Sequence, residues 1–158
     1  GAVPAHWVTL DDDVMGGHSR SRVTLRGGVL VFSGTTSLED NGGFASIRAR
    51  GAFDFDGALG LRLRLRGDGR RYQLRLATDA RHRGSKVSWR GEVAAPADTW
   101  TDAVVAFDRM QPTYRGTVLD GPALMRSKVE DVGVLVGDGR AGAFMLQIAG
   151  IAPVHGVS

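Results

Sequence analysis

Residues 59–76 read Leu-Gly-Leu-Arg-Leu-Arg-Leu-Arg-Gly-Asp-Gly-Arg-Arg-Tyr-Gln-Leu-Arg-Leu, and this stretch decides the fold. Apolar residues alternate with arginine or glycine, and a period of two predicts strands with one buried face. The pair Asp68-Gly69 in the middle is typical of a two-residue hairpin turn, because both positions tolerate a positive φ. We therefore predict a hairpin in which Leu65 faces Tyr72 and Leu63 faces Leu74.

The opposite face of the predicted hairpin is rich in arginine. It would pair Arg66 with Arg71 and Arg62 with Arg75, and like charges directly opposite each other are unfavourable. Residues 61–90 hold ten Lys or Arg and two acids, whereas the rest of the chain has a net charge of −5. Two interpretations stay open: acids from neighbouring strands neutralise this face, or an anionic partner binds to it.

Length and composition suit one domain over residues 1–158. The 23 glycines and 5 prolines fit many short strands joined by tight turns. The absence of cysteine excludes disulfides, thiolate nucleophiles and iron–sulfur ligation. No run of about 18 apolar residues predicts a membrane span, and no signal leader opens the sequence. A cytoplasmic location is favoured, although a start at Gly1 rather than Met leaves a processed N-terminus open.

The remaining strands follow from short apolar runs between turn signals. No helical periodicity extends over three turns, so the sequence predicts an all-β sandwich or barrel. A second hairpin is indicated by Gly27-Gly28. Strands are expected at 7–10, 22–25, 29–32, 43–48, 86–90, 100–107, 132–136 and 144–151, and loops at 33–41, 79–85 and 109–122.

Three sequence motifs are candidates for a nucleotide site, a hydrolase site and a metal site. Residues 137–142 have the spaced glycines of a dinucleotide site, but a strand-like run follows where that site needs a helix, which favours a turn. His18 beside Ser19 lacks the strained elbow of a hydrolase. Asp11, Asp12 and Asp13 are weak metal candidates, because calcium-loop spacing is absent and a solvated acidic loop or a capping carboxylate explains them as well. No cofactor is expected.

Aromatic residues near the arginines suggest a binding platform. Trp89, Tyr72 and Tyr114 could stack on a sugar or on single-stranded nucleic acid. The alternative is burial in the core, where large aromatics are common. No ribonucleoprotein-type aromatic signature accompanies them.

Four segments, at 7–19, 38–48, 60–72 and 142–148, together resemble the complex I intermediate-associated protein 30 family. Departures at Asp40, Ala106 and Met110 look like packing changes. The resemblance implies a jelly-roll β-sandwich of the galactose-binding-domain-like type. Mitochondrial members of the family are chaperone-like assembly factors for NADH:ubiquinone oxidoreductase, and plant relatives are linked to RNA handling. The matching loop residues are Asp12, Met15, Gly16, Gly17, Ser19, Asn41, Gly42, Gly43, Phe44, Arg48 and Asp68.

These loop residues allow two arrangements. The glycines are expected to set backbone turns or close approaches. In the structural arrangement Arg48 bridges Asp12 while Asn41 caps loop amides. In the other arrangement the same groups form a recognition site at the rim of the sandwich.

The sequence therefore predicts a non-catalytic binding module that recognises a protein partner through an arginine-rich sheet face. The alternatives are a carbohydrate or small polar ligand, then RNA, and then an enzyme, for which no acid–base pair can be named. The oligomeric state and the partner's identity stay open. The expected contact residues are Arg62, Arg64, Arg66, Arg71, Tyr72, Arg75 and Trp89.

Overall fold

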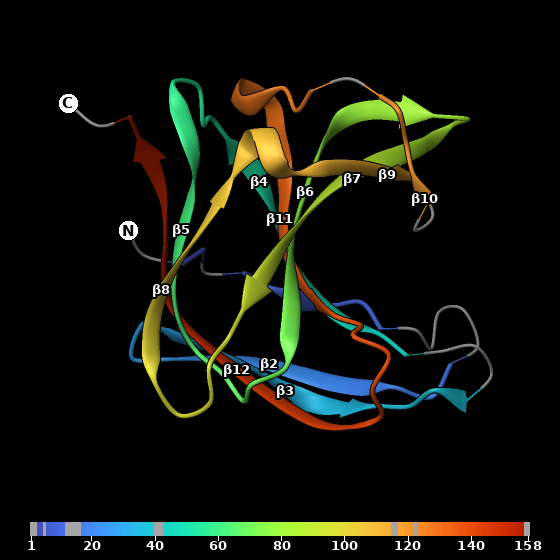
Figure 1. Cartoon of the computed structure of the whole chain (residues 1–158), viewed down its shortest axis with the longest axis vertical. Helices are drawn as coiled ribbons and strands as arrows, with labels where there is room; N and C mark the ends of the chain where they lie inside the picture. The colour runs from blue at the N-terminus through green and yellow to red at the C-terminus, as the bar shows by residue number, and fades with distance from the viewer. Residues whose placement is uncertain are drawn as a thin grey trace.

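The chain folds into two antiparallel sheets packed face to face, as a computed structural model shows (Figure 1). The structure describes residues 3–4, 6–11, 17–39, 43–114, 117–121 and 123–156. The β-sandwich predicted from the sequence is confirmed. No helix in the described part of the chain has the length and apolar character needed to cross a membrane.

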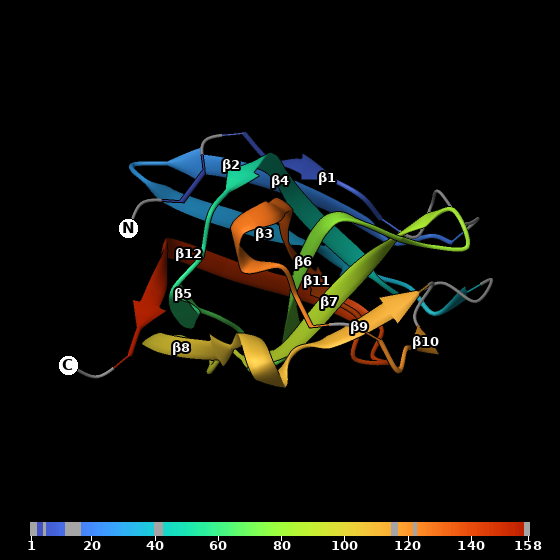
Figure 2. The same ribbon diagram turned by 90° about the horizontal axis from the view of Figure 1, so that it is seen from above.

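Sheet A forms one layer of the sandwich, and its strands are labelled in the view from above (Figure 2). Its strands, in spatial order, are β1 (Val8–Thr9), β4 (Ala45–Phe53), β11 (Val129–Val136), β6 (Arg71–His82), β7 (Ser85–Ala94), β9 (Gln111–Tyr114) and β10 (Thr117–Val118).

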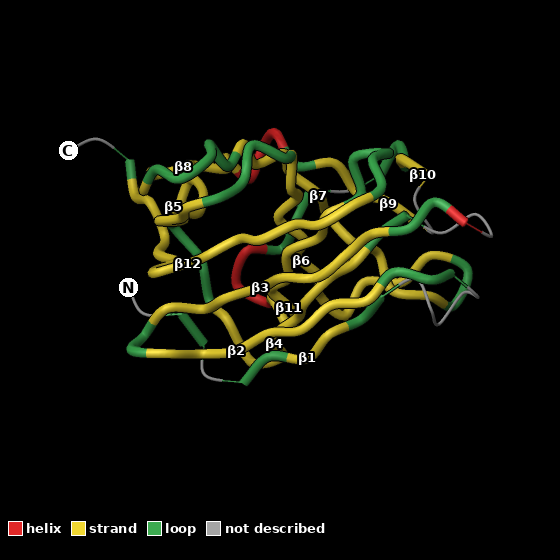
Figure 3. Tube along the Cα trace, turned by 90° about the horizontal axis from the view of Figure 1, so that it is seen from below, coloured by secondary structure: helices red, strands yellow, loops and turns green. Residues whose placement is uncertain are grey.

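Sheet B forms the other layer, and its strands lie side by side in the view from below (Figure 3). In spatial order they are β2 (Arg20–Arg26), β3 (Val29–Thr36), β12 (Gly142–His155), β5 (Ala58–Arg66) and β8 (Trp100–Ala106). Two short 3-10 turns, η3 (Phe107–Arg109) and η4 (Arg126–Lys128), occur between strands.

The core lies between the sheets and is built by the period of two. Leu61, Leu63 and Leu65 of β5 are buried from one side. Tyr72 and Leu74 of β6 are buried from the other, and all five belong to one apolar cluster. Each such side chain contributes about 1.5–3 kcal/mol on burial, so the alternating stretch supplies a large part of the folding free energy.

The predicted pairing of β5 with β6 is wrong, because the two strands belong to different sheets (Figure 1). Leu65 faces Ile148 of β12 and Thr101 of β8, whereas Leu74 faces Val134 of β11. In a hairpin the leucines would share one face of one sheet, and in the sandwich they point at each other across the core. Both arrangements bury the same residues, so the alternation alone cannot distinguish them.

The turn between β5 and β6 is real, but it crosses from sheet B to sheet A. Gly69 has a φ of 85°, as the turn requires. Its N–H donates to the carbonyl of Ala95 at 2.8 Å, and the N–H of Gly67 donates to the carbonyl of Pro96 at 3.2 Å. A Cβ on Gly67 would lie 2.3 Å from the Cβ of Ala95, so the corner needs glycine there.

The structure confirms some of the other strand and loop boundaries predicted from the sequence and corrects the rest. The Gly27-Gly28 hairpin is confirmed by β2 and β3, which pair Leu25 with Leu30. The loop expected at 79–85 is wrong, because β6 and β7 continue to a turn at Arg83 and Gly84. The loops expected at 33–41 and 109–122 are wrong in part, since β3 runs to Thr36 and strands β9 and β10 lie in the second segment. These pieces are polar and lack a clear alternation, so the local sequence pattern does not mark them as strands.

Candidate functional site

A groove of about 890 Å³ lies on the outer face of sheet A. Strands β4, β11, β6 and β7 form its floor, and the segments on either side of β4 and after β11 form its rim. We call it the sheet A groove. Its polar and charged lining residues are Ser46, Arg48, Gln73, Arg75, Lys86, Ser88, Arg90 and Asp131, and its apolar ones include Leu10, Leu38, Phe44 and Leu135.

Three arginines form a line across the groove floor. Strand pairing places Arg48 opposite Gly133, Gly133 opposite Arg75, and Arg75 opposite Arg90. We call Arg48, Arg75 and Arg90 the arginine row. With about 4.8 Å between neighbouring strands, Arg75 and Arg90 are adjacent, and Arg48 stands about 10 Å from Arg75 across the glycine.

Arg75 is held in place by neutral groups. Its guanidinium donates from Nε to Ser88 Oγ at 3.0 Å, from Nη1 to Gln73 Oε1 at 2.9 Å, and from Nη2 to Thr113 Oγ1 at 3.4 Å. Burial, followed by the charge of Arg90, lowers the pKa of Arg75 from its ordinary value. Across the described residues, no carboxylate lies within ion-pair distance of the arginine row.

The acids beside the row are already engaged with other cations. Lys86 Nζ donates to Glu130 and to Asp131, each at 2.9 Å. Arg50 Nε donates to the second oxygen of Asp131 at 3.2 Å. Burial alone would raise the pKa of Asp131, but the hydrogen bonds from Lys86 and Arg50 outweigh it and hold this pKa below its ordinary value. The charge of Arg48 also acts on Asp131, so Arg75 and Arg90 are the members of the row that no carboxylate among the described residues balances at close range.

The opposite part of the groove is apolar. Leu10 and Leu38 keep 39% and 48% of their surface exposed, which is high for leucine. Phe44 and Leu135 are half-buried beside them. We call these four residues the apolar end. The sheet A groove is thus basic along the arginine row, which crosses β4, β6 and β7, and apolar at Leu135 and toward the start of β4.

The arginine-rich face predicted from the hairpin is divided between two outer faces. Arg62, Arg64 and Arg66 belong to β5 and face outward from sheet B, whereas Arg71 and Arg75 belong to β6 of sheet A. The prediction of one continuous face is wrong, because it depended on pairing β5 with β6. Of the five predicted arginines, Arg75 lines the sheet A groove.

The arginines of sheet B have acidic neighbours. Arg64 Nη1 lies 3.3 Å from a carboxylate oxygen of Asp102, and Arg66 Nη2 lies 3.9 Å from one of Asp98. Arg64 also lies over the ring of Trp100, at 6.0 Å from its centroid. A neighbouring strand thus supplies the acid for Arg64, the segment before β8 supplies the one for Arg66, and no ion pair of Arg62 is found among the described residues.

Neither aromatic residue predicted as an anchor is accessible. Trp89 is 1% exposed and Tyr72 is fully buried, so the alternative of burial in the core is confirmed for both. The Tyr72 hydroxyl donates to Asp68 Oδ2 at 3.0 Å, and burial together with the Asp68 charge raises the pKa of Tyr72. Trp89 Nε1 has no hydrogen-bond acceptor among the described residues. Tyr114 is half-buried and packs edge-on against His82.

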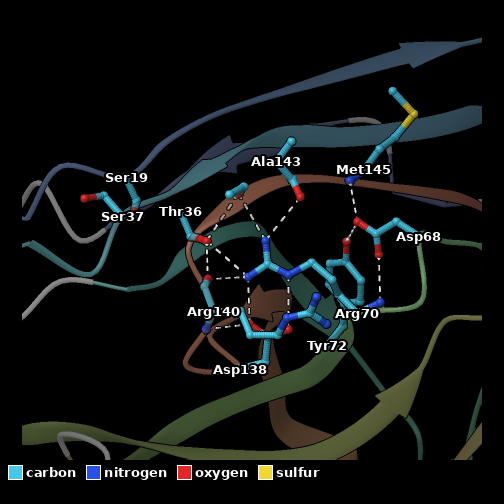
Figure 4. A network of polar contacts seen from close by, with 11 residues as sticks. Ser19, Thr36, Ser37, Asp68, Arg70, Tyr72, Asp138, Arg140, Ala143 and Met145 are labelled. Carbon is cyan, nitrogen blue, oxygen red and sulfur yellow. Dashed lines mark hydrogen bonds and ion pairs between the residues drawn. The ribbon is translucent and has the colours of Figure 1, made fainter.

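The two Gly-Asp-Gly-Arg segments meet at one edge of the sandwich (Figure 4). Arg70 is buried there, and its guanidinium bonds both oxygens of Asp138, at 2.7 and 3.1 Å. It also donates to Thr36 Oγ1 and to the carbonyls of Arg140, Gly142 and Ala143. These bonds raise the pKa of Arg70 and lower that of Asp138. The turn predicted at 137–142 is confirmed, and its role is to fasten the β11–β12 connection to the β5–β6 connection.

Asp68 caps the corner from the other segment. One carboxylate oxygen accepts from the N–H of Arg70 at 3.0 Å, and the other accepts from the N–H of Met145 at 2.8 Å. Asp138 accepts from the N–H of Arg140 in the same local way, at 3.2 Å. Asp68 is therefore a structural residue of the corner.

The motif loops are described in part. Ser19 is buried and accepts a hydrogen bond from the N–H of Ser37 at 3.0 Å. Asp11 is buried and accepts from Ser21 Oγ at 2.6 Å and from the N–H of Ser46 at 3.3 Å. Gly17 is buried, and Gly43 has a φ of 130°. Outside the described residues lie Asp12, Asp13, Met15, Gly16, Asn41 and Gly42, so the Asp12–Arg48 bridge and the Asn41 cap stay predictions.

Metal ligation finds no support in the described part of the chain. No group of three or more His, Asp or Glu side chains gathers there in a way that could hold an ion. The carboxylate of Asp11 accepts hydrogen bonds from the Ser21 hydroxyl and from the N–H of Ser46. The role of a capping carboxylate, one of the alternatives for this aspartate, is the one observed.

Sequence reasoning missed Arg90 and three residues of the apolar end, Leu10, Leu38 and Leu135, whereas Phe44 was named among the motif-loop residues. The alternation of Lys86, Ser88 and Arg90 in β7 shows that they share one face. What the local pattern does not contain is the register, which brings β7 beside β6 and β11 beside β4. The arginine row exists only through that register.

The chain resembles known proteins both in sequence and in fold. The family described as Complex I intermediate-associated protein 30 matches residues 2–148. No curated protein matches. Among solved structures, a family 11 carbohydrate-binding module from Clostridium thermocellum, in complex with a β-1,3-1,4-mixed-linked tetrasaccharide, has a TM-score of 0.70 and 11% identity, with 96% of this chain and 90% of that chain covered.

Two further structures agree on the fold. The solution structure of a family 11 carbohydrate-binding module has a TM-score of 0.70 and 12% identity, with 99% of this chain and 92% of that chain covered. An agarase has a TM-score of 0.60 and 13% identity, with 99% of this chain and 23% of that chain covered. At these identities the likeness shows a shared β-sandwich. The match over residues 2–148 shows more: the chain belongs to the complex I intermediate-associated protein 30 family.

Proposed function

We propose that this protein is a non-catalytic recognition module that binds an acidic part of a protein partner in the sheet A groove. The observation that carries the proposal is the arginine row, which has no carboxylate partner among the described residues. An assembly-factor-like role is supported by membership of the family, whose description refers to intermediates of complex I.

The physical argument is one of uncompensated charge. Arg75 and Arg90 stand directly opposite each other, an arrangement that costs free energy in the free protein. A bound carboxylate would relieve that repulsion and accept charge-assisted hydrogen bonds, each contributing about 1.5–3 kcal/mol. Because Arg75 is already oriented by Ser88 and Gln73, little side-chain entropy is lost on binding.

The test uses the two outer faces as a matched pair. The groove variant is Arg48→Glu/Arg90→Glu, and the control variant is Arg62→Glu/Arg64→Glu, which makes the same charge change on sheet B. Each protein is immobilised and exposed to nuclease-treated lysate of the source organism, and captured proteins are identified by mass spectrometry. We expect proteins that bind to the wild type and to the control but not to the groove variant.

Two results would contradict the proposal. Equal capture by all three proteins would mean that the groove is not the contact surface. Capture that occurs in a parallel untreated lysate and is absent after nuclease treatment would favour RNA. Melting temperatures of both variants should stay within a few degrees of wild type, which shows that any loss of capture is not a loss of folding.

The second candidate function is binding of a carbohydrate. It is favoured by the fold shared with a carbohydrate-binding module that was solved with a tetrasaccharide. Phe44 is the one aromatic side chain among the described lining residues, so a sugar would be held mainly by hydrogen bonds from Gln73, Ser88 and the arginine row. Calorimetric titration with the mixed-linked tetrasaccharide distinguishes the two functions, because binding of a neutral sugar should change little between low and high salt.

A further inference from the structure

We infer that the sheet A groove selects a short extended peptide segment, with acidic side chains at one end and a bulky apolar side chain at the other. This inference rests on the proposed function and names the partner's chemistry. It follows from how the basic and apolar parts of the groove are arranged on the strands.

Two neighbouring lines of residues cross the groove floor. The first holds the arginine row with Gly133. The second pairs Ser46 with Leu135, and Leu135 with Gln73. The N–H of Leu10 donates to the carbonyl of Ser46 at 2.8 Å, which extends the second line past β4. A ligand that runs along the strands would therefore pass from the guanidinium groups of the first line to the leucines of the second, two residues further on.

The distance between the two parts of the groove fits a few residues of extended chain. Leu135 stands two residues from Gly133 along β11, and Phe44 stands four residues from Arg48, so the apolar end begins about 7 Å from the arginine row and reaches about 13 Å along the strands. An extended peptide advances about 3.3 Å per residue, so two to four residues cover this distance. The acidic and apolar side chains of the ligand should therefore stand two to four positions apart.

Gly133 shapes the basic part of the site. It lies between Arg48 and Arg75, is buried, and carries no side chain that would stand between the two arginines. A Cβ built there would lie 2.8 Å from the carbonyl oxygen of Ile47 and 3.8 Å from the Cβ of Arg75, so even alanine is too close to the backbone. A carboxylate above this glycine has one arginine on each side.

The apolar end excludes a uniform polyanion. Leu10, Leu38, Phe44 and Leu135 occupy one part of the groove, and phosphates or uronates placed there would lose water without a charge partner. An acidic peptide with an apolar residue fills both parts. The apolar contact also adds free energy in proportion to its area, about 25 cal/mol for each Å² removed from water.

The experiment measures fluorescence anisotropy with three labelled synthetic peptides. The first is Glu-Glu-Ser-Gly-Leu-Phe, the second replaces both glutamates by lysine, and the third replaces Leu-Phe by Ser-Ser. We expect the first to bind at least tenfold more tightly than either of the others. Tetragalacturonate, which is acidic without an apolar part, is the competitor and should not displace it.

Three variants locate the site. Arg48→Gln/Arg90→Gln should weaken the first peptide at least tenfold, and Leu135→Ser should abolish its preference over the third peptide. Arg62→Gln/Arg64→Gln, on sheet B, should leave both values unchanged. Circular dichroism melts check that each variant is folded. Wild type should bind the first peptide more tightly at low salt, and Arg48→Gln/Arg90→Gln should not, which gives an independent measure of the charge contact.

The failures are distinguishable. Equal binding of the first and third peptides, or displacement by tetragalacturonate, would overturn the inference. If no peptide binds while lysate capture still depends on Arg48 and Arg90, the inference fails and the proposed function stands. If neither measurement depends on these arginines, both fail.

Discussion

The two outer faces of the sandwich carry arginines from the same alternating stretch, yet their charges are arranged differently. On sheet B, Arg64 of β5 faces Asp102 of β8. On sheet A, Arg75 of β6 faces Arg90 of β7, with Gly133 on its other side. The stretch itself is uniform, so the difference comes entirely from the strands that pair with it. On sheet B an arginine of the stretch pairs with an acid of the fold, whereas on sheet A Arg75 faces a second arginine.

The largest expected effect is a difference in the free energy of unfolding between substitutions at two tryptophans, one near each face. Trp89 lies under the floor of sheet A at 1% exposure, whereas Trp100 lies half-buried on sheet B beside Arg64. Trp89→Ala should lower the free energy of unfolding by about 3–5 kcal/mol, because it opens a cavity in the core. Trp100→Ala should cost about 1 kcal/mol. Urea denaturation measures both, and similar losses would mean that Trp89 is not a core residue.

The next effect tests the corner that keeps the two faces in separate sheets. Arg70→Ala leaves the carboxylate of Asp138 buried without its partner and should cost about 3 kcal/mol. The matched control is Arg140→Ala at the same position of the second Gly-Asp-Gly-Arg segment, where the side chain is exposed and the backbone carbonyl makes the contact. That control should stay within about 0.5 kcal/mol of wild type. A costly Arg140→Ala would show that the two segments are not distinguished in this way.

The same ion pair sets a dependence on acid. Because Arg70 lowers the pKa of Asp138 below its ordinary 3.8, the unfolded chain takes up a proton first as the pH falls. The stabilisation is fully present above pH 3.8 and is lost as the pH drops toward the lowered folded value. Wild type should lose more stability than Asp138→Asn over this interval, as measured by urea midpoints at successive pH values. Parallel curves would contradict the role of Asp138.

The smallest effect should have opposite signs on the two faces. Arg90→Gln removes the repulsion with Arg75 and should stabilise the fold by a few tenths of a kcal/mol, up to about 1. Arg64→Gln loses the contact with Asp102 and should destabilise it by about 0.3 kcal/mol. Both changes should shrink in high salt. Thermal melts at two salt concentrations measure them, and the same sign for both would remove the distinction between the faces.

The sequence predicted the all-β sandwich, the buried set and most strand positions, because a period of two and turn residues are local signals. It placed Leu61, Leu63, Leu65 and Leu74 correctly in the core, but it named the buried Tyr72 as a contact residue. It did not predict which strands pair, since a turn at Asp68-Gly69 serves a hairpin and a sheet-to-sheet crossing equally well. The candidate site depended on that missing information.

The arginine row shows how the missing strand pairing hid the candidate site. Arg48 and Arg75 were both named from the sequence, but for different reasons and different places. Their common floor depends on β11, whose residues are more than fifty positions away from either. Gly133 between them carries no signal of its own in a chain with 23 glycines.

The strand order has a consequence for the kinetics of folding. The last two described strands, β11 and β12, are interior strands, one in each sheet: β11 separates β4 from β6, and β12 separates β3 from β5. Sheet A stays in two pieces until β11 has been synthesised, and sheet B until β12 has been, so a ribosome-bound chain ending before residue 129 holds four partial sheets with open edges. Such a topology favours slow, late folding and a need for protection against aggregation during synthesis.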